Sequence, residues 1–159
     1  MNPIGVVICN YNKKDFVLQC VQSVLESKEK NFDIYVVDNA SSDGSAEALK
    51  KAYGNRITVI ENKENLGGSG GFNTGLRIVR DKGYSYFMCL DDDAAVDENA
   101  LSVLYHSWKS IQIPVWLDVV FTTHRCRIIF SRVDYSLILT TARQKRLERT
   151  CRKMAVCLM

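Results

Sequence analysis

Three consecutive aspartates, Asp91, Asp92 and Asp93, follow an apolar run that ends at Leu90. Two like charges about 4 Å apart near a protein surface repel by roughly 4 kcal/mol, and a bound divalent cation removes that cost. Ligands that are all oxygen favour Mn²⁺ or Mg²⁺. Because side chains alternate along an extended backbone, Asp91 and Asp93 are the expected metal ligands, and Asp92 is expected to face the other way. A solvated acidic turn is the alternative interpretation.

A glycine-rich stretch from Gly67 to Gly71 (GGSGG) precedes a helical pattern and is the second candidate site. Glycines let the backbone approach a ligand closely, and the first N–H groups of a helix favour phosphate. The stretch is not a P-loop, because its Gly-x4-Gly spacing is followed by Leu76-Arg77 rather than by Lys-Ser/Thr. We therefore expect contact with a phosphate or a sugar here, and the alternative is a flexible loop.

Apolar runs that alternate with helical patterns are expected to position these residues. The expected strands are Ile4–Cys9, Phe32–Val37, Ile57–Glu61 and Tyr84–Leu90. A first helix capped by Asn12 is expected to bury Val17, Cys20, Val21 and Val24, and two later helices follow the second and third strands. This alternation predicts an α/β fold with a mostly parallel sheet flanked by helices. Ligands bind beyond the carboxyl ends of such strands, so the polar clusters that end these strands are expected to form one site.

The composition changes near Leu101. Residues 1–100 carry 11 lysines and arginines against 15 aspartates and glutamates, whereas residues 101–159 carry 10 against 3. All nine glycines lie in the first hundred residues. Strands are expected at Val115–Phe121 and Arg127–Arg132. Thr141–Met159 is either a basic amphipathic helix that lies on an anionic membrane surface or a poorly ordered basic tail.

The length of 159 residues predicts one domain, and no apolar run is long enough for a spanning helix. The short apolar stretch at the N-terminus is not typical of a signal peptide. The six cysteines contain no CxxC pair, which favours a reduced, cytoplasmic setting, at most peripheral to the inner face of the membrane. No nucleic-acid partner is expected.

Four motifs taken together resemble glycosyltransferase family 2, whose members have the Rossmann-like GT-A fold. They are VVICNYNKKDFVLQCVQSV, IYVVDNASSDGS, ENKENLGGSGGFNTG and YFMCLDDDA, and they cover roughly residues 3–100. The NLGGSGGFN element is similar to the galactofuranosyl- and rhamnosyltransferase branch, which acts in cell-surface polysaccharide synthesis.

The resemblance implies a UDP- or dTDP-linked sugar donor and a glycan or lipid-linked acceptor. Cys9 and Tyr11 would border the base, and Asp38 would accept the imide N–H. Asp91 and Asp93 would be the metal-binding DxD pair of an inverting enzyme. The remaining donor-site residues, along the phosphates and the sugar, would be Gly70, Gly71, Asn73 and Asp92.

The chain departs from the family pattern after the aspartates. Its later acids are Asp118, Asp134 and Glu148, none of which lies in a recognisable motif, so no catalytic base is assigned. We expect a nucleotide-sugar-binding half at residues 1–100, and a truncated fold whose basic segment 101–159 is not native to it. Alternatives are a non-catalytic nucleotide-binding relic and a haloacid-dehalogenase-like phosphatase, whose nucleophile motif an apolar strand ending Asp91-x-Asp93 also fits.

Overall fold

A six-stranded sheet with the order β3-β2-β1-β4-β6-β5 forms the centre of the protein. The computed structural model describes residues 4–110, 117–119 and 128–132. The strands are β1 (Ile4–Asn10), β2 (Phe32–Asp38), β3 (Thr58–Glu61), β4 (Tyr86–Asp91), β5 (Leu117–Val119) and β6 (Ile128–Arg132). The helices are α1 (Lys14–Leu25), α2 (Ser45–Tyr53), the short 3-10 helix η1 (Gly54–Arg56), α3 (Gly67–Asp81) and α4 (Ala100–Ser110).

Strands β1 to β4 are parallel to one another, which confirms the predicted α/β fold. Each of these strands lies within two residues of its predicted bounds, because a buried parallel strand produces a continuous apolar run. β6 pairs with β4 in the antiparallel direction, and β5 pairs with β6. Both strands lie inside the ranges predicted for the last third of the chain.

The sheet and its core extend past residue 100. Leu101, Leu104 and Tyr105 of α4 are buried in the same apolar cluster as β1 and α1, and β6 adds a strand beside β4. These contacts tie the chain around residue 100 to the sheet, although the division at that residue, and whether the later segment is native to the fold, stay predictions. The predicted basic helix over Thr141–Met159 lies outside the described residues.

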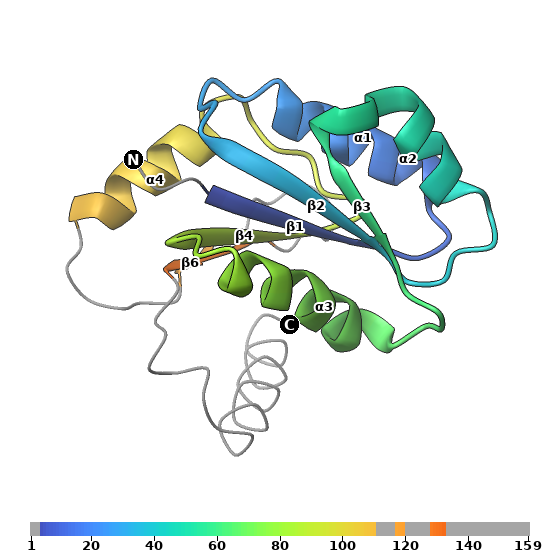
Figure 1. Cartoon of the computed structure of the whole chain (residues 1–159). Coiled ribbons are helices and arrows are strands. Elements are labelled where there is room, and N and C mark those ends of the chain that lie inside the picture. The colour runs from blue at the N-terminus through green and yellow to red at the C-terminus, as the bar shows by residue number, and fades with distance from the viewer. Residues whose placement is uncertain (1–3, 111–116, 120–127, 133–159) are drawn as a thin grey trace, which may run out of the picture.

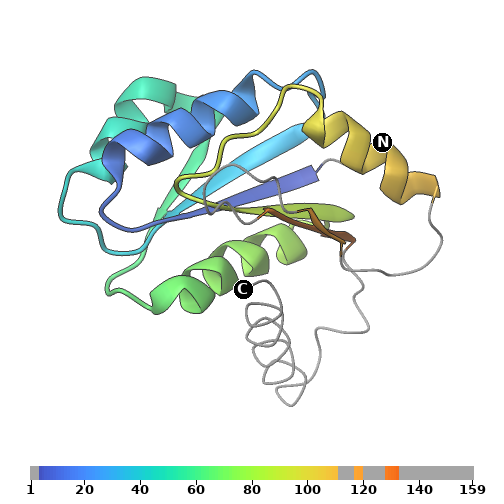
Figure 2. The same ribbon diagram turned by 180° about the vertical axis from the view of Figure 1, so that it is seen from behind.

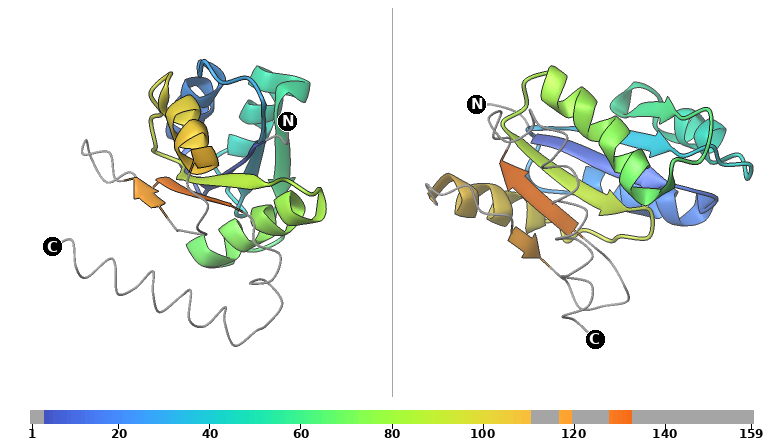
Figure 3. Two further views of the ribbon diagram at one scale, coloured as in Figure 1. Left: turned by 90° about the vertical axis from the view of Figure 1, so that its left-hand side faces the viewer. Right: turned by 90° about the horizontal axis from the view of Figure 1, so that it is seen from below.

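Helices cover both faces of the sheet. In Figure 1, α1, α2 and α4 lie on one face and α3 lies on the other, and the view from behind in Figure 2 shows the same division. Among the described elements, Figure 3 shows α3 on the face of the sheet opposite α4. The larger apolar cluster fills the α1 side, where the predicted helix stripe is confirmed: Val17, Cys20, Val21 and Val24 are all fully buried.

The packing of α3 on β1 accounts for three of the glycines. Gly71, Gly75 and Val79 form one stripe of the helix, and a Cβ atom added to Gly75 would lie 2.3 Å from Val7 Cγ1. At the other end of the contact the glycine is on the strand and the larger residue is on the helix. A Cβ added to Gly5 of β1 would lie 2.7 Å from Val79 Cγ2 of α3. α3 begins at Gly67, so the predicted glycine stretch opens the helix and forms its first turns, and its small residues let the helix lie close to the sheet.

The predicted Asn12 cap of α1 is also wrong. The residue before α1 is Lys13, which makes no side-chain cap, and the Oδ1 atom of Asn12 instead accepts the Ser42 N–H at 2.8 Å. Asp43 caps α1 from a loop 29 residues away, where its Oδ2 accepts the Lys14 N–H at 2.9 Å. Its Oδ1 accepts the Ser45 N–H at 3.0 Å, so one carboxylate caps the starts of α1 and α2.

Candidate functional site

The carboxyl ends of the parallel strands meet at one edge, as predicted. The register pairs Asn10 with Asp38 and Cys9 with Asp91. The Asn10 side chain is fully buried, and its Nδ2 donates to Asp38 Oδ1 at 2.8 Å and to Ser41 Oγ at 3.1 Å. Asp38 Oδ2 accepts the Ser41 N–H at 3.0 Å. Both oxygens of Asp38, the residue predicted to contact the base, are thus engaged within the protein.

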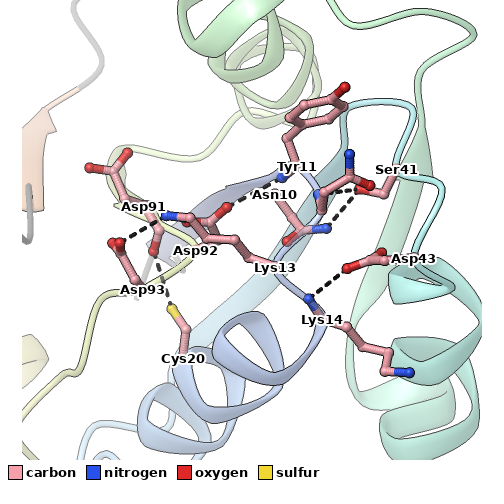
Figure 4. Close-up of polar contacts among 11 residues, drawn as sticks. Asn10, Tyr11, Lys13, Lys14, Cys20, Ser41, Asp43, Asp91, Asp92 and Asp93 are labelled. Atoms are coloured by element: carbon pink, nitrogen blue, oxygen red, sulfur yellow. Dashed lines mark hydrogen bonds and ion pairs between the residues drawn. The ribbon is translucent and has the colours of Figure 1, made fainter.

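Asp92 joins the aspartate turn to the loop after β1. Its Oδ2 accepts the Tyr11 N–H at 3.3 Å, and its Oδ1 lies 2.9 Å from the Lys13 ammonium. The same ammonium lies 2.9 Å from Asp93 Oδ2, so two carboxylates converge on one cation (Figure 4). The expectation that Asp92 and Asp93 face opposite ways is wrong, because β4 ends at Asp91 and the strand alternation ends with it.

Two side chains of this cluster, Lys13 and Cys9, have shifted pKa values. Hydrogen bonds to Asp93 and Asp92 raise the pKa of Lys13 well above its usual value, so the side chain stays cationic. Burial first, and then the charges of Asp92, Asp91 and Asp38, raise the pKa of the Cys9 thiol to about 12. Cys9 is therefore a neutral thiol at physiological pH, surrounded by carboxylates rather than activated by cations.

Asn39 organises one side of the candidate site, and the sequence analysis assigned it no role. It is 2% exposed and makes four side-chain hydrogen bonds. Its Nδ2 donates to Asn65 Oδ1 at 2.8 Å and to the Gly67 carbonyl at 3.1 Å. Its Oδ1 accepts from Asn62 Nδ2 at 3.0 Å and from the Leu66 N–H at 3.1 Å. Asn39 thereby fixes the first turn of α3 against the end of β2.

The predicted donor-site residues of α3 do not share one surface. Gly71 faces the sheet, where an added Cβ would lie 2.3 Å from Cys9 Sγ. Gly70 and Asn73 are three positions apart and lie on a neighbouring face of the helix. Gly67 and Gly68 are the open positions, because a Cβ at either would meet nothing within 4 Å. Cys9, Asp38, Asp91 and Asp92 are brought together with Gly71, whereas Asn73 stands to one side.

Lys13 and Asn39 carried little signal in the sequence. Lys13 is one of two adjacent lysines in a loop, and its partner Asp92 is 79 residues away. Asn39 comes after Asp38, the residue that ends the apolar run of the second strand, and its place among the polar residues at that strand end was the one available hint.

The aspartates fit a divalent cation only in part. Asp92 is buried and holds the Tyr11 N–H, while Asp91 and Asp93 are half-buried. Across the described residues, no group of three or more His, Cys, Asp or Glu side chains is arranged to hold an ion. Mg²⁺ sites of this kind use one or two carboxylates and take their other ligands from substrate phosphates and water. The carboxylates present fit that type of site and do not fit a cage made by the protein alone.

Solved structures share this fold. The mannosyltransferase PcManGT from Pyrobaculum calidifontis, in complex with GDP-Man and Mn²⁺, superimposes with a TM-score of 0.65 at 20% identity, over 75% of this chain and 35% of that one. TarS 1-349 from S. aureus, in complex with UDP-GlcNAc, gives 0.58 at 19% identity, over 65% and 30%. In the described part of the chain, no helix is long and apolar enough to cross a membrane.

Sequence relatives point the same way. The chain is 29% identical over 107 residues to a poly-beta-1,6-N-acetyl-D-glucosamine synthase of Staphylococcus aureus, which covers 67% of this chain and 25% of the relative. It is 31% identical over 93 residues to the glucosyltransferase WfaP of Escherichia coli, over 58% of this chain and 36% of the relative. The chain thus spans about a quarter to a third of these proteins. Residues 5–145 match the family described as "Glycosyl transferase family 2", and the chain belongs to that family.

Proposed function

We propose that the chain binds a UDP- or dTDP-linked sugar together with Mn²⁺ or Mg²⁺, as the donor site of an inverting glycosyltransferase. Its acceptor would be a glycan or a lipid-linked sugar in cell-surface polysaccharide synthesis. The observation that carries the proposal is the convergence of Asp92, Lys13 and Tyr11 at the carboxyl edge. Asp92 is 81 positions from Tyr11 and 79 from Lys13 in the chain, and the three meet where parallel sheets bind their ligands.

The nucleotide end of the proposal rests on Tyr11 and Asp38. The Tyr11 ring is 46% exposed and can stack on a base. A carboxylate has about four acceptor positions, so the two internal hydrogen bonds of the buried Asp38 leave lone pairs that could accept an imide N–H. Among the similar proteins, WfaP is named for UDP-Glc and one TarS structure holds UDP-GlcNAc, whereas PcManGT holds GDP-Man. GDP is therefore the competitor to test against UDP and dTDP.

The phosphate end rests on the first turn of α3. An added Cβ would meet nothing within 4 Å at Gly67 or Gly68, and the first turn contains no acidic side chain. The N–H groups at this end of the helix favour phosphate. In the proposal Gly70, Gly71 and Asn73 continue the site toward the sugar.

Asp91 and Asp93 would hold the metal, and Asp92 would keep its contacts with Tyr11 and Lys13. When bound, the metal would neutralise charge on the departing nucleoside diphosphate. Transfer also needs a carboxylate base. Between Ala94 and Ser107 the acids are Asp97, which accepts the Asn99 N–H at 2.8 Å, and Glu98, which lies 2.6 Å from Lys28 Nζ.

The proposal therefore treats donor binding and transfer separately. The described residues support donor binding, and the proposal assigns no residue as the base for transfer. A non-catalytic nucleotide-binding protein stays the alternative. The phosphatase alternative is not favoured, because the aspartates follow β4 rather than the first strand.

Calorimetric titration tests the proposal. We would titrate UDP, dTDP and GDP into the full chain with Mn²⁺ and again with EDTA, and compare Asp91→Asn with the control Asp81→Asn at the exposed end of α3. We expect metal-dependent binding of UDP or dTDP that Asp91→Asn weakens at least about tenfold, since it removes one charged ligand. A chain that circular dichroism shows to be folded, yet binds none of the nucleotides, would contradict the proposal. Binding without turnover would favour the non-catalytic alternative.

A further inference from the structure

We propose that Lys13 is a built-in cation of the aspartate turn, which a divalent metal must displace from Asp93 before it can bind. The metal would then enter efficiently only together with the donor diphosphate. This inference rests on the proposed metal-dependent donor binding and adds that the metal and the donor bind together. It assigns to one lysine the task of keeping metal out of a site that holds no donor.

The geometry gives Lys13 two carboxylate partners, although its own side chain is 43% exposed. Its Nζ lies 2.9 Å from Asp92 Oδ1 and 2.9 Å from Asp93 Oδ2, so one ammonium bridges two carboxylates. The Asp92 side chain is 10% exposed, and its second oxygen accepts the N–H of Tyr11 from the same loop. The lysine therefore starts from a fixed backbone, which lowers the entropy lost when the ion pair forms.

The partners differ in how easily they can be released. The Asp93 side chain is 32% exposed, and Asp92 is buried. A metal that approaches Asp91 and Asp93 from solvent meets the ammonium on Asp93 and is repelled by it. We expect Lys13 to leave Asp93 and to keep Asp92, whose buried charge would otherwise lose its cation.

This arrangement links the metal to the donor. Without a donor, the metal would gain two carboxylates and would have to displace a cation from one of them. With a donor, the diphosphate oxygens complete the coordination. Binding of either ligand then raises the affinity for the other by the same factor. In the rival interpretation, Lys13 only fastens the loop after β1 to the aspartate turn and has no effect on metal affinity.

Manganese binding without nucleotide separates the two interpretations. Loss of the free Mn²⁺ signal in electron paramagnetic resonance would be followed in the full chain for wild type, Lys13→Gln, Lys13→Arg and Lys14→Gln. Lys14→Gln removes the same charge one residue away, where among the described residues the ammonium forms no ion pair. We expect Lys13→Gln to bind Mn²⁺ roughly tenfold more tightly, and the other two variants to stay within about twofold of wild type. Equal affinity of Lys13→Gln and wild type would overturn the inference.

The same titration with UDP present separates this inference from the proposed function. If Mn²⁺ binds none of the variants with or without UDP, the proposed function fails and the inference fails with it. If Mn²⁺ binds in a UDP-dependent way but Lys13→Gln is no tighter than wild type without UDP, the inference alone is overturned.

Wild-type protein offers a second test should Lys13→Gln not fold. The ammonium signal of Lys13 in ¹⁵N-lysine-labelled chain can be assigned by its absence in Lys13→Arg. We expect Mg²⁺ added to the UDP-saturated chain to shift that signal. A signal that does not change while Mg²⁺ saturates the site would count against displacement.

Discussion

The two motifs of the candidate site, the glycines of α3 and the aspartates after β4, differ in how far the fold itself accounts for them. Gly71 and Gly75 face β1, where a larger side chain would overlap Cys9 or Val7. The aspartate turn differs, because the Asp93 side chain is 32% exposed and its carboxylate lies 2.9 Å from the Lys13 ammonium. A glycine motif at a helix start is thus compatible with packing alone, whereas adjacent carboxylates that share one lysine call for a functional explanation.

The largest effect that would test this comparison is expected at Gly75. Gly75→Ala places a Cβ 2.3 Å from Val7 Cγ1 and 3.1 Å from Val37 Cγ2, so the helix must move away from the sheet. We expect a loss of about 2 kcal/mol in the free energy of unfolding, measured with urea.

Gly68→Ala is the matched control in the same helix. An added Cβ meets nothing within 4 Å there, so we expect a gain of about 0.5 kcal/mol from reduced freedom of the unfolded chain. Equal losses for Gly68→Ala and Gly75→Ala would show that the glycines are needed for backbone conformation and not for contact with β1.

At Asp93 we expect a substitution to change metal affinity and to leave the free energy of unfolding almost unchanged. Asp93→Asn keeps the size of the side chain and removes its charge, so the unfolding free energy should change by less than about 0.5 kcal/mol. Mn²⁺ affinity in the presence of UDP should fall about tenfold, or 1.4 kcal/mol, when followed by calorimetry. A large stability loss with unchanged metal affinity would assign Asp93 to the fold and remove the contrast with the glycines.

The sequence could predict the strands but not these contacts, for a physical reason. Apolar runs reveal buried strands because neighbouring residues carry the pattern. The contact of Gly75 with Val7 depends on which strand α3 packs against and on the position of the helix along that strand. The pairing of Lys13 with Asp92 depends on the register between β1 and β4. The gathering of polar residues at one edge of the sheet could be predicted, because all parallel strands have their carboxyl ends there. The hydrogen-bond or ion-pair partner of each side chain at that edge could not be predicted.

A double-mutant cycle between Gly71 and Cys9 tests whether the α3 glycines are required by packing against β1. The Cβ of Gly71→Ala would lie 2.3 Å from Cys9 Sγ, and Cys9→Ala removes that sulfur. We therefore expect Gly71→Ala to be about 1 kcal/mol less destabilising in the Cys9→Ala background than in wild type, by urea unfolding. Additive losses would mean that Gly71 is restricted by something other than the thiol.

The smallest effect concerns Asp43, an aspartate whose role the fold does explain. Burial by itself raises the pKa of its carboxyl. Hydrogen bonds from the Ser45 hydroxyl and from the N–H groups of Lys14 and Ser45 outweigh burial, and they lower the pKa below its usual value. A lowered pKa in the folded state stabilises the fold above the unfolded pKa of about 3.9, and that stability is lost as the pH falls through the folded pKa.

Asp43→Asn should separate this structural aspartate from those after β4. An amide has one acceptor oxygen, so it can cap α1 or α2 but not both, and we expect a loss of about 1 kcal/mol at pH 7. The difference from wild type should shrink as the pH falls below about 4, because protonated Asp43 also loses an acceptor. Urea unfolding between pH 7 and pH 3 measures this. A difference that stays constant over that range would mean that the Asp43 charge has no part in capping. Capping of α1 and α2 would then not explain why an aspartate stands at this position.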